Sequence, residues 1–301
     1  MITYFTECNW SSENFRRLEK LGPVTEVDVD NYTESGPALS NTILIHPMMG
    51  VDLSVFDNLT IVASNTTSDE FIDTAHCREN EIKVLTLAGQ EMLQDITATA
   101  EHTLALILAA YKRIPLMHER SMRGSWTRWE SARDLMLSEM TLGIIGGGRV
   151  GQHLFKRASH LFMETFVFDP PKGIGNHILA EYEPDVIAIC CSLTPQTRGM
   201  INEEFLNKMQ RRAILVNTAR GDIINDRDLL NHLDRHPQFS AALDVLPGEF
   251  EYPRPRVFWD YIDYARGHSN LILTPHIAGS TYSAWDKTQR AIIDMIWEEM
   301  E

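Results

Sequence analysis

Short apolar runs alternate with amphipathic segments along the first third of the chain. The runs lie at residues 2–5, 42–45, 60–63 and 83–87, and apolar positions at helical spacing lie at 12–21 and 68–77. Short apolar runs bounded by polar residues are typical of strands buried on both faces of a sheet, whereas the helical spacing indicates covering helices. This alternation predicts a parallel, doubly wound sheet.

A longer apolar segment, residues 95–117, then predicts one mostly buried helix, capped by Asp95 or Thr97, that could connect two domains. A second and stronger alternation begins at Thr141. It predicts strands at 141–145, 165–168, 186–191, 213–217, 240–245 and 271–274, and helices at 150–161, 203–209, 226–234 and 281–301. Residues 247–264 are rich in proline and aromatic side chains and are expected to be irregular.

Composition narrows the class of protein. A chain of 301 residues suits two domains, and its hydrophobic share of 44% is that of a globular protein. The net charge of −15 argues against nucleic acid or an anionic membrane as partner. The N-terminus shows no signal peptide, the longest apolar run is too short to span a bilayer, and the four cysteines fit neither a metal site nor a disulfide framework. We therefore expect a cytoplasmic α/β protein without a metal; the cysteines are Cys8, Cys77, Cys190 and Cys191.

The sequence GGGRVG at residues 146–151 is the motif with the clearest chemistry. It follows an apolar strand and opens a helix, which is the context that a dinucleotide-binding turn requires. Gly146 permits the tight turn, Gly148 lets the backbone approach a pyrophosphate, and Gly151 allows close packing of helix on strand. The N–H groups at the helix start, from Arg149 and Val150 onward, would meet the phosphate charge.

The next strand ends in Asp169, 18 residues after the last glycine of the turn. An acid at that place binds the ribose hydroxyls of the adenosine, and its charge repels the 2′-phosphate of NADP. The sequence therefore predicts NAD as the cofactor.

Three further strand ends each carry a charged residue: Arg220, Glu249 and His276. Taken singly, each is an ordinary loop residue. In an open α/β sheet, however, ligands bind outside the carboxyl ends of the strands, so the three could converge there. Of the other histidines, His102 on the predicted connector helix is the one to watch.

At this point the sequence resembles the D-isomer-specific 2-hydroxyacid dehydrogenases over roughly residues 95–285. The resemblance rests on the glycine turn with Asp169 and on several separately placed motifs in the same order: TAEHT at 99–103, LTPQTRG at 193–199, VNTARG at 216–221, LDV at 243–245 with Glu249 after it, and TPH at 274–276. It implies a Rossmann-type NAD domain, residues 95–277, inserted into a flavodoxin-like substrate domain made of residues 1–94 and 278–301. It also implies a homodimer with the 95–117 helix as its seam.

The resemblance also implies roles in hydride transfer between the cofactor and a small 2-hydroxy acid or 2-keto acid. His276 would be the acid/base, Glu249 would hydrogen-bond its other ring nitrogen, and Arg220 would bind the substrate carboxylate and carbonyl oxygen. The remaining cofactor contacts would come from Thr194, Thr218, Ala219, Asp244 and Gly279, with Asp244 at the nicotinamide end.

Two of the departures from the family pattern bear directly on the predicted site. The Gly-rich loop that usually binds the substrate carboxylate is replaced by Ser64 to Ser68, so the substrate contacts would come from Asn65, Thr66 and Thr67. Phe250 follows Glu249 in place of the usual proline.

Two alternatives stay open. The first is a non-enzymatic NAD(H)-sensing protein-interaction module, since corepressors of this family use the same fold. The second is an enzyme for a larger or sugar-derived 2-hydroxy acid, which the polar loop at residues 65–68 suggests.

Overall fold

The protein was analysed as a computed structural model that describes residues 2–5, 10–27, 43–45, 49–131, 135–169, 183–251 and 253–301. The chain forms two compact units. Met1–Ile96 and Ser280–Glu301 make up the smaller unit, and Thr97–Gly279 make up the larger one. Cys8 and the first residue of the strand expected at 42–45 lie outside the described residues.

The smaller unit contains a parallel sheet of five strands in the order β2-β1-β3-β4-β5. This is the flavodoxin-like order, which confirms the fold class expected for this part of the chain. The strands are β1 (Ile2–Phe5), β2 (Val24–Val27), β3 (Ile43–Ile45), β4 (Ile61–Ala63) and β5 (Lys83–Leu85). Strand β2 was not predicted, because it lies at the sheet edge and its polar Thr25 and Glu26 interrupt the apolar pattern.

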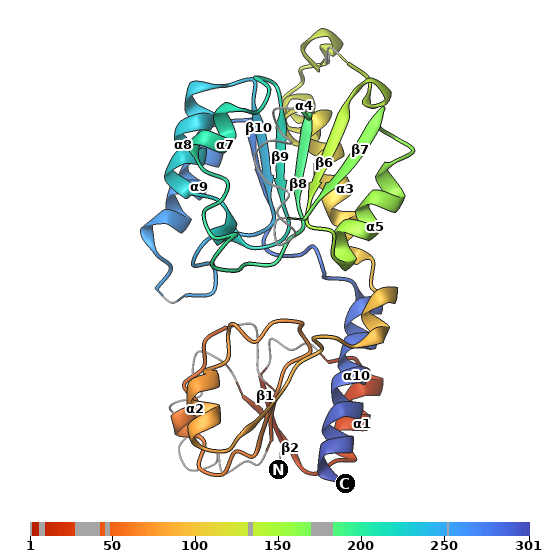
Figure 1. Cartoon of the computed structure of the whole chain (residues 1–301), viewed down its shortest axis with the longest axis vertical. Helices are drawn as coiled ribbons and strands as arrows, with labels where there is room; N and C mark the ends of the chain where they lie inside the picture. Colours follow the sequence, from red (N-terminus) through yellow and green to blue (C-terminus); the bar gives the residue numbers. More distant parts are fainter. Residues whose placement is uncertain are drawn as a thin grey trace. The chain divides into compact units, whose positions relative to one another are not determined.

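The helices of the smaller unit are α1 (Ser12–Glu19), α2 (Thr74–Glu79) and α10 (Tyr282–Met300) (Figure 1). The helix predicted at 68–77 was wrong at its start. The carboxylate of Asp73 accepts hydrogen bonds from the backbone N–H groups of Ala75 and His76, and with this N-cap the helix begins at Thr74, six residues later than expected.

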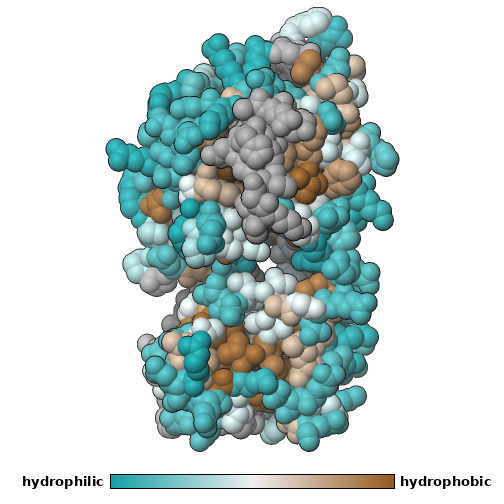
Figure 2. Space-filling view, in the orientation of Figure 1, coloured by the Kyte–Doolittle hydropathy of each residue, from teal (hydrophilic) through white to brown (hydrophobic). Residues whose placement is uncertain are grey.

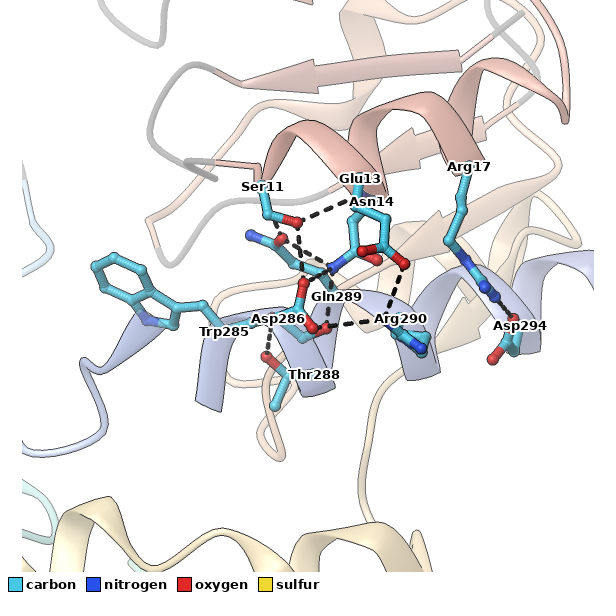
Figure 3. A network of polar contacts seen from close by, with 10 residues as sticks. All are labelled: Ser11, Glu13, Asn14, Arg17, Trp285, Asp286, Thr288, Gln289, Arg290 and Asp294. Atoms are coloured by element: carbon cyan, nitrogen blue, oxygen red, sulfur yellow. Dashed lines mark hydrogen bonds and ion pairs between the residues drawn. The ribbon is translucent and has the colours of Figure 1, made fainter. Parts of the chain in front are cut away.

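A buried polar network joins α10 to α1 and so ties the last segment of the chain to the first (Figure 3). Asn14 is fully buried, and its side-chain amide donates to the backbone carbonyl of Asp286 at 2.9 Å. The backbone N–H of Ser11 donates to the side chain of Gln289 at 3.0 Å. The side-chain oxygen of Gln289, which is also buried, accepts from the amide of Asn14 at 3.4 Å as well.

The larger unit contains a parallel sheet of six strands in the order β11-β10-β9-β8-β6-β7. Its strands are β6 (Thr141–Ile145), β7 (Glu164–Phe168), β8 (Val186–Ile189), β9 (Ile214–Asn217), β10 (Ser240–Leu243) and β11 (Leu271–Leu273). All five strand pairs are parallel, as the continuous apolar runs predict.

Helices cover both faces of this sheet (Figure 1). Along β8, Ile187 packs in one apolar cluster, whereas its neighbours Val186 and Ala188 pack in the other. The first cluster includes side chains from α7 (Glu203–Asn207), α8 (Asp226–Arg235) and α9 (Arg256–Gly267), and the second includes side chains from α3 (Ala98–Tyr111) and α5 (Arg149–Ala158). The doubly wound architecture predicted from sequence is therefore confirmed.

Two predictions of local structure in the larger unit were wrong. The single helix expected at 95–117 is two helices, because α3 ends at Tyr111, Arg113 adopts a left-handed conformation (φ 51°), and α4 (Ile114–Met122) then begins. Pro115 causes the break, since its ring would clash with the carbonyl of Tyr111 in a continuous helix. The region expected to be irregular contains most of α9, whose Tyr261 is buried in the core.

Candidate active site

The carboxyl ends of the six parallel strands of the larger unit lie at one edge of the sheet. Strands β7 and β8 lie on opposite sides of β6, so the strand order reverses next to the turn that follows β6. Ligands of open α/β sheets bind at such a reversal. Each loop that carries a predicted site residue of this unit starts at this edge.

The glycine turn after β6 is tightly constrained at two of its glycines. Gly146 has φ 109°, and a Cβ there would lie 2.5 Å from the backbone nitrogen of Cys191. A Cβ on Gly151 would lie 1.9 Å from the carbonyl oxygen of Gly146. Gly148 differs, because a Cβ there would meet no atom within 4 Å. The open side of the turn is therefore at Gly148, where a phosphate would approach.

Helix α5 begins directly after Gly148, and no side chain caps its first N–H groups. These donors therefore suit a pyrophosphate. Asp169 follows β7, and one of its carboxylate oxygens would lie 3.1 Å from a Cβ on Gly147, which places the acid beside the turn. Burial lowers the pKa of the neighbouring Arg149 guanidinium. These features fit a dinucleotide with an adenosine ribose near Asp169.

The two cysteines after β8 lie against the same turn. The peptide bond between Cys190 and Cys191 is the group that excludes a side chain at Gly146. Burial raises the pKa of Cys191 to about 11, and burial together with Cys191 raises the pKa of Cys190 to about 12. Both thiols therefore stay protonated at neutral pH, which disfavours nucleophilic thiol chemistry at this edge.

Thr194 lies in the loop after β8, in a turn closed by Thr197, whose hydroxyl accepts from the backbone N–H of Thr194 at 2.8 Å. An ion pair of 2.7 Å between Arg198 and Asp222 then joins this loop to the loop after β9. The first loop is thus fixed to the segment that carries Arg220.

Arg220 ends a turn that is stabilised by hydrogen bonds of the Asn217 side chain. Asn217 is fully buried; its amide donates to the carbonyl of Arg220 at 2.8 Å and its oxygen accepts from the N–H of Ala219 at 2.9 Å. The half-buried guanidinium of Arg220 donates to the carbonyl of Ala219 at 2.8 Å. Thr218, in the same turn, is buried.

Asp244 follows β10, and its side chain is buried completely. Its carboxylate accepts from the backbone N–H groups of Ile277 at 3.0 Å and Ala278 at 2.8 Å, and from the hydroxyl of Thr274 at 2.5 Å. All three donors belong to the loop after β11. The buried carboxylate thus holds the loop that contains His276.

His276 adopts a left-handed backbone conformation with φ 52°. Such a conformation in a non-glycine residue costs about 1–3 kcal/mol and persists only where its surroundings impose it. Here the N–H of His276 donates to the carbonyls of Asp244 at 2.8 Å and Thr274 at 3.0 Å.

The imidazole of His276 contacts Glu249, which comes from the loop after β10. The distance between Nδ1 of His276 and Oε1 of Glu249 is 2.9 Å, and the two side chains are 20% and 14% exposed. The ring of Phe250 lies 5.2 Å from the imidazole, centre to centre. Phe250, which replaces the usual proline, therefore packs beside His276, and Glu249 contacts the same histidine.

The remaining predicted site residues are Gly279 of the larger unit and residues 65–67 of the smaller unit. Gly279, at the end of the larger unit, has room for a Cβ, with Thr99 as the nearest group at 3.8 Å. Asn65, Thr66 and Thr67 follow β4 in the smaller unit, where the hydroxyl of Thr66 donates to the carbonyl of Ser68 at 2.8 Å. Thr67 is exposed, and Asn65 is half-buried.

Sequence reasoning assigned no role to two residues that contact this edge, Thr103 of α3 and Thr274, which directly follows β11. Thr103 is fully buried, and its hydroxyl lies 2.7 Å from that of Thr218. Thr274 lies between Asp244 and His102. The partners are 115 and 172 residues apart in the sequence, and no local pattern marks such pairs.

Comparison with known proteins identifies the family of this site. The model of the D-isomer specific 2-hydroxyacid dehydrogenase NAD-binding domain matches residues 104–278, which carry the glycine turn, Asp169, Arg220 and the His276–Glu249 pair. The chain belongs to this family. It is an NAD-dependent 2-hydroxyacid dehydrogenase, as the motifs predict.

Relatives of this family match most of the chain. The glyoxylate reductase/hydroxypyruvate reductase of Mus musculus is 30% identical over 246 residues, covering 77% of this chain and 70% of the relative. The hydroxypyruvate reductase of Thermotoga maritima is 28% identical over 98% of this chain and 92% of its own length. The fold is also that of the D-lactate dehydrogenase of Aquifex aeolicus, solved with NAD and lactic acid (TM-score 0.80, 22% identity, 100% of this chain and 95% of the other).

In the described part of the chain, no helix combines the length and apolar character needed to cross a membrane.

Proposed function

We propose that this dehydrogenase reduces a small 2-keto acid, or oxidises the corresponding 2-hydroxy acid, with His276 as its acid/base. The observation that carries the proposal is the contact of 2.9 Å between Nδ1 of His276 and Glu249, at the edge that also carries Arg220. Reduction of a ketone needs a proton on the carbonyl oxygen, and a protonated imidazole can deliver it near neutral pH.

Glu249 fixes which ring nitrogen faces the substrate. A carboxylate that accepts from Nδ1–H leaves Nε2 to donate its proton to the carbonyl oxygen, and to take it back in the reverse reaction. Arg220 is the group for the substrate's carboxylate and carbonyl oxygen, since its planar fork binds such oxygens in pairs and polarises the carbonyl. NADH, when bound, supplies the hydride.

We propose that the larger unit holds NAD through the turn at 146–151 and the loops at the same edge. Gly146, Gly148, Arg149, Val150 and Gly151 would bind the pyrophosphate. Asp169 would bind the adenosine ribose, because its carboxylate lies beside Gly147 of this turn. The remaining contacts would come from the strand ends, at Thr194, Thr218, Ala219, Asp244 and Gly279.

The smaller unit would supply substrate contacts through residues 65–67. Thr66 already donates its hydroxyl proton to Ser68, so we assign Asn65 and Thr67 as donors to the substrate carboxylate. Hydroxypyruvate and glyoxylate are the first substrates to test, since the relatives from Mus musculus and Thermotoga maritima carry these names.

Turnover tests this proposal directly. NADH oxidation is followed with glyoxylate, pyruvate, hydroxypyruvate and a larger, sugar-derived 2-keto acid, and a preference for hydroxypyruvate or glyoxylate is expected. A preference for larger, sugar-derived acids would overturn the substrate assignment. NAD binding without turnover on any acid would instead favour an NAD-sensing module.

We also propose a cytoplasmic homodimer, with the dimer seam in the larger unit. Helix α3 is largely buried in its own core, whereas α4 buries none of its residues. The segment of α4 and the residues after it exposes large apolar side chains: Met122 (76%), Trp126 (91%), Trp129 (73%) and Met136 (62%). In Figure 2, apolar residues interrupt the hydrophilic surface near the top of the larger unit, where Figure 1 draws this segment. Four exposed large apolar side chains in one segment favour contact with a protein partner. Light scattering of the intact protein tests whether that partner is a second copy of this chain.

A further inference from the structure

Helix α3 contacts two of the loops that carry the proposed catalytic groups, through two adjacent residues. His102 lies beside the loop after β11, which contains His276, and Thr103 lies beside the turn after β9, which contains Arg220. We propose that His102 and Thr103 are positioning residues that together fix His276 and Arg220 for the reaction. This inference rests on the proposed function for its kinetic consequences, but its structural consequence can be tested independently.

The contact at His102 has a defined direction. Nε2 of His102 lies 3.2 Å from the hydroxyl oxygen of Thr274 and 3.4 Å from Oδ1 of Asp244. The hydroxyl proton of Thr274 already goes to Asp244, so Thr274 can only accept from the histidine. Nε2 of His102 therefore carries a proton and donates it to the hydroxyl of Thr274.

The same carboxylate imposes the conformation of His276. Asp244 accepts from the N–H groups of the two residues after His276, and the backbone carbonyl of Asp244 accepts from His276 itself. The strained residue is thus held from both sides by one buried acid. His102, on the neighbouring helix, donates to Thr274, and Thr274 in turn donates to that acid.

The contact at Thr103 has a defined direction as well. Its hydroxyl donates to the carbonyl of Thr99 at 2.7 Å within α3, so it accepts from the hydroxyl of Thr218, 2.7 Å away. Both residues are buried, so loss of this hydrogen bond would leave a hydroxyl without a partner away from water, which is unfavourable. Thr218 is two residues before Arg220, so this bond fixes the start of the arginine turn.

Substitution at His102 is the sharpest test. His102→Leu keeps much of the side-chain volume but removes the donor. We expect kcat for the preferred keto acid to fall by about threefold to tenfold, because the hydrogen bond to the hydroxyl of Thr274, which itself donates to the carboxylate of Asp244, is lost. The Kd for NADH should stay within about twofold, since the turn at 146–151 is untouched. His102→Gln supplies an amide donor and should recover most of kcat.

One control variant and one matched pair of substitutions at Thr103 make the kinetic result specific. His160→Leu removes an exposed histidine of the same unit and should leave kcat unchanged. Thr103→Val should lower kcat and raise KM for the keto acid through the Arg220 turn, whereas Thr103→Ser, which keeps the hydroxyl, should not. Equal losses for His102→Leu and His102→Gln would overturn the proposal, because packing rather than the hydrogen bond would then explain them.

A crystal structure of His102→Leu gives the readout that does not depend on turnover. We expect His276 to leave its left-handed conformation, or its Nδ1 to move out of hydrogen-bonding distance of Glu249. An unchanged loop would overturn the positioning role, whatever the substrate is. Failure of the proposed function would be seen elsewhere, as full turnover by His276→Ala or as no turnover by the wild-type enzyme.

Discussion

Nδ1 of His276 lies 2.9 Å from the carboxylate of Glu249, and the histidine makes this contact from a left-handed backbone conformation. The two residues come from different loops, after β11 and β10, and neither side chain is more than 20% exposed. A strained residue that is paired with a shielded carboxylate is costly to maintain, which is typical of a functional site.

Glu249→Gln tests the carboxylate of the pair. The amide can still accept a hydrogen bond from Nδ1, but it no longer stabilises a positive charge on the ring. We expect kcat to fall about tenfold to a hundredfold, since a charge-assisted hydrogen bond becomes a neutral one. Glu251→Gln, at an exposed neighbouring position, is the matched control and should behave as wild type. Equal activity of the two variants would remove Glu249 from the mechanism.

Asp169→Ala tests the choice between NAD and NADP. Removing this carboxylate should erode the preference for NADH over NADPH, because its charge no longer repels the 2′-phosphate. The measurement is the ratio of kcat/KM for the two cofactors, with the exposed Asp263→Ala as control. A ratio that stays at the wild-type value would show that another residue contacts the ribose.

Two glycines of the same turn should respond differently to alanine. At Gly151 a Cβ would lie 1.9 Å from the carbonyl of Gly146, so Gly151→Ala should destabilise the larger unit or prevent folding. At Gly148 a Cβ meets no protein atom, so Gly148→Ala should fold with an unchanged Tm but bind NADH more weakly. Thermal unfolding and NADH titration separate the two effects. Tight NADH binding by Gly148→Ala would place the pyrophosphate elsewhere.

His232 should make the fold sensitive to acid. Burial, with smaller contributions from His236 and Arg235, lowers the pKa of His232 to about 4. The unfolded chain, with an ordinary pKa near 6.5, therefore binds more protons between about pH 4 and 6.5, and stability is lost as the pH falls through this range. Burial raises the pKa of Asp226 to about 6. This group acts in the opposite direction, because its contribution to the stability of the fold is lost as the pH rises.

The variant His232→Gln separates these two opposing effects. Urea unfolding at pH 4.5, 5.5 and 7 should show the wild type losing stability relative to this variant as the pH falls. A constant difference between the two proteins over this range would contradict the assignment.

Most strands could be predicted from sequence because they are buried on both faces and appear as continuous apolar runs. The predicted and observed bounds of β6 agree at both ends, and β2 failed because an edge strand with Glu26 lacks such a run. Helix α9 failed because its alternating aromatic and charged residues near several prolines resemble a loop. The break after Tyr111 shows the local effect of a single proline on an otherwise helical pattern.

The site divides in the same way. Residues within motifs, such as Arg220 and His276, could be found because their neighbours in sequence mark them. The bonds that hold these motifs could not, although their residues lie in motifs themselves, because the bonds of Thr103 to Thr218 and of His102 to Thr274 join distant parts of the chain. Such pairs can be identified only in the folded structure, where α3 lies beside the loops that follow β9 and β11.

The most direct test of the central claim is the turnover of His276→Ala beside its binding of NADH. We expect kcat with the preferred keto acid to fall by about a hundredfold to ten-thousandfold, the usual contribution of general acid–base catalysis, because the variant lacks the group proposed to protonate the carbonyl. The Kd for NADH should stay near the wild-type value, since the turn at 146–151 is intact. Turnover within about twofold of the wild type would contradict the assignment of His276 as the acid/base.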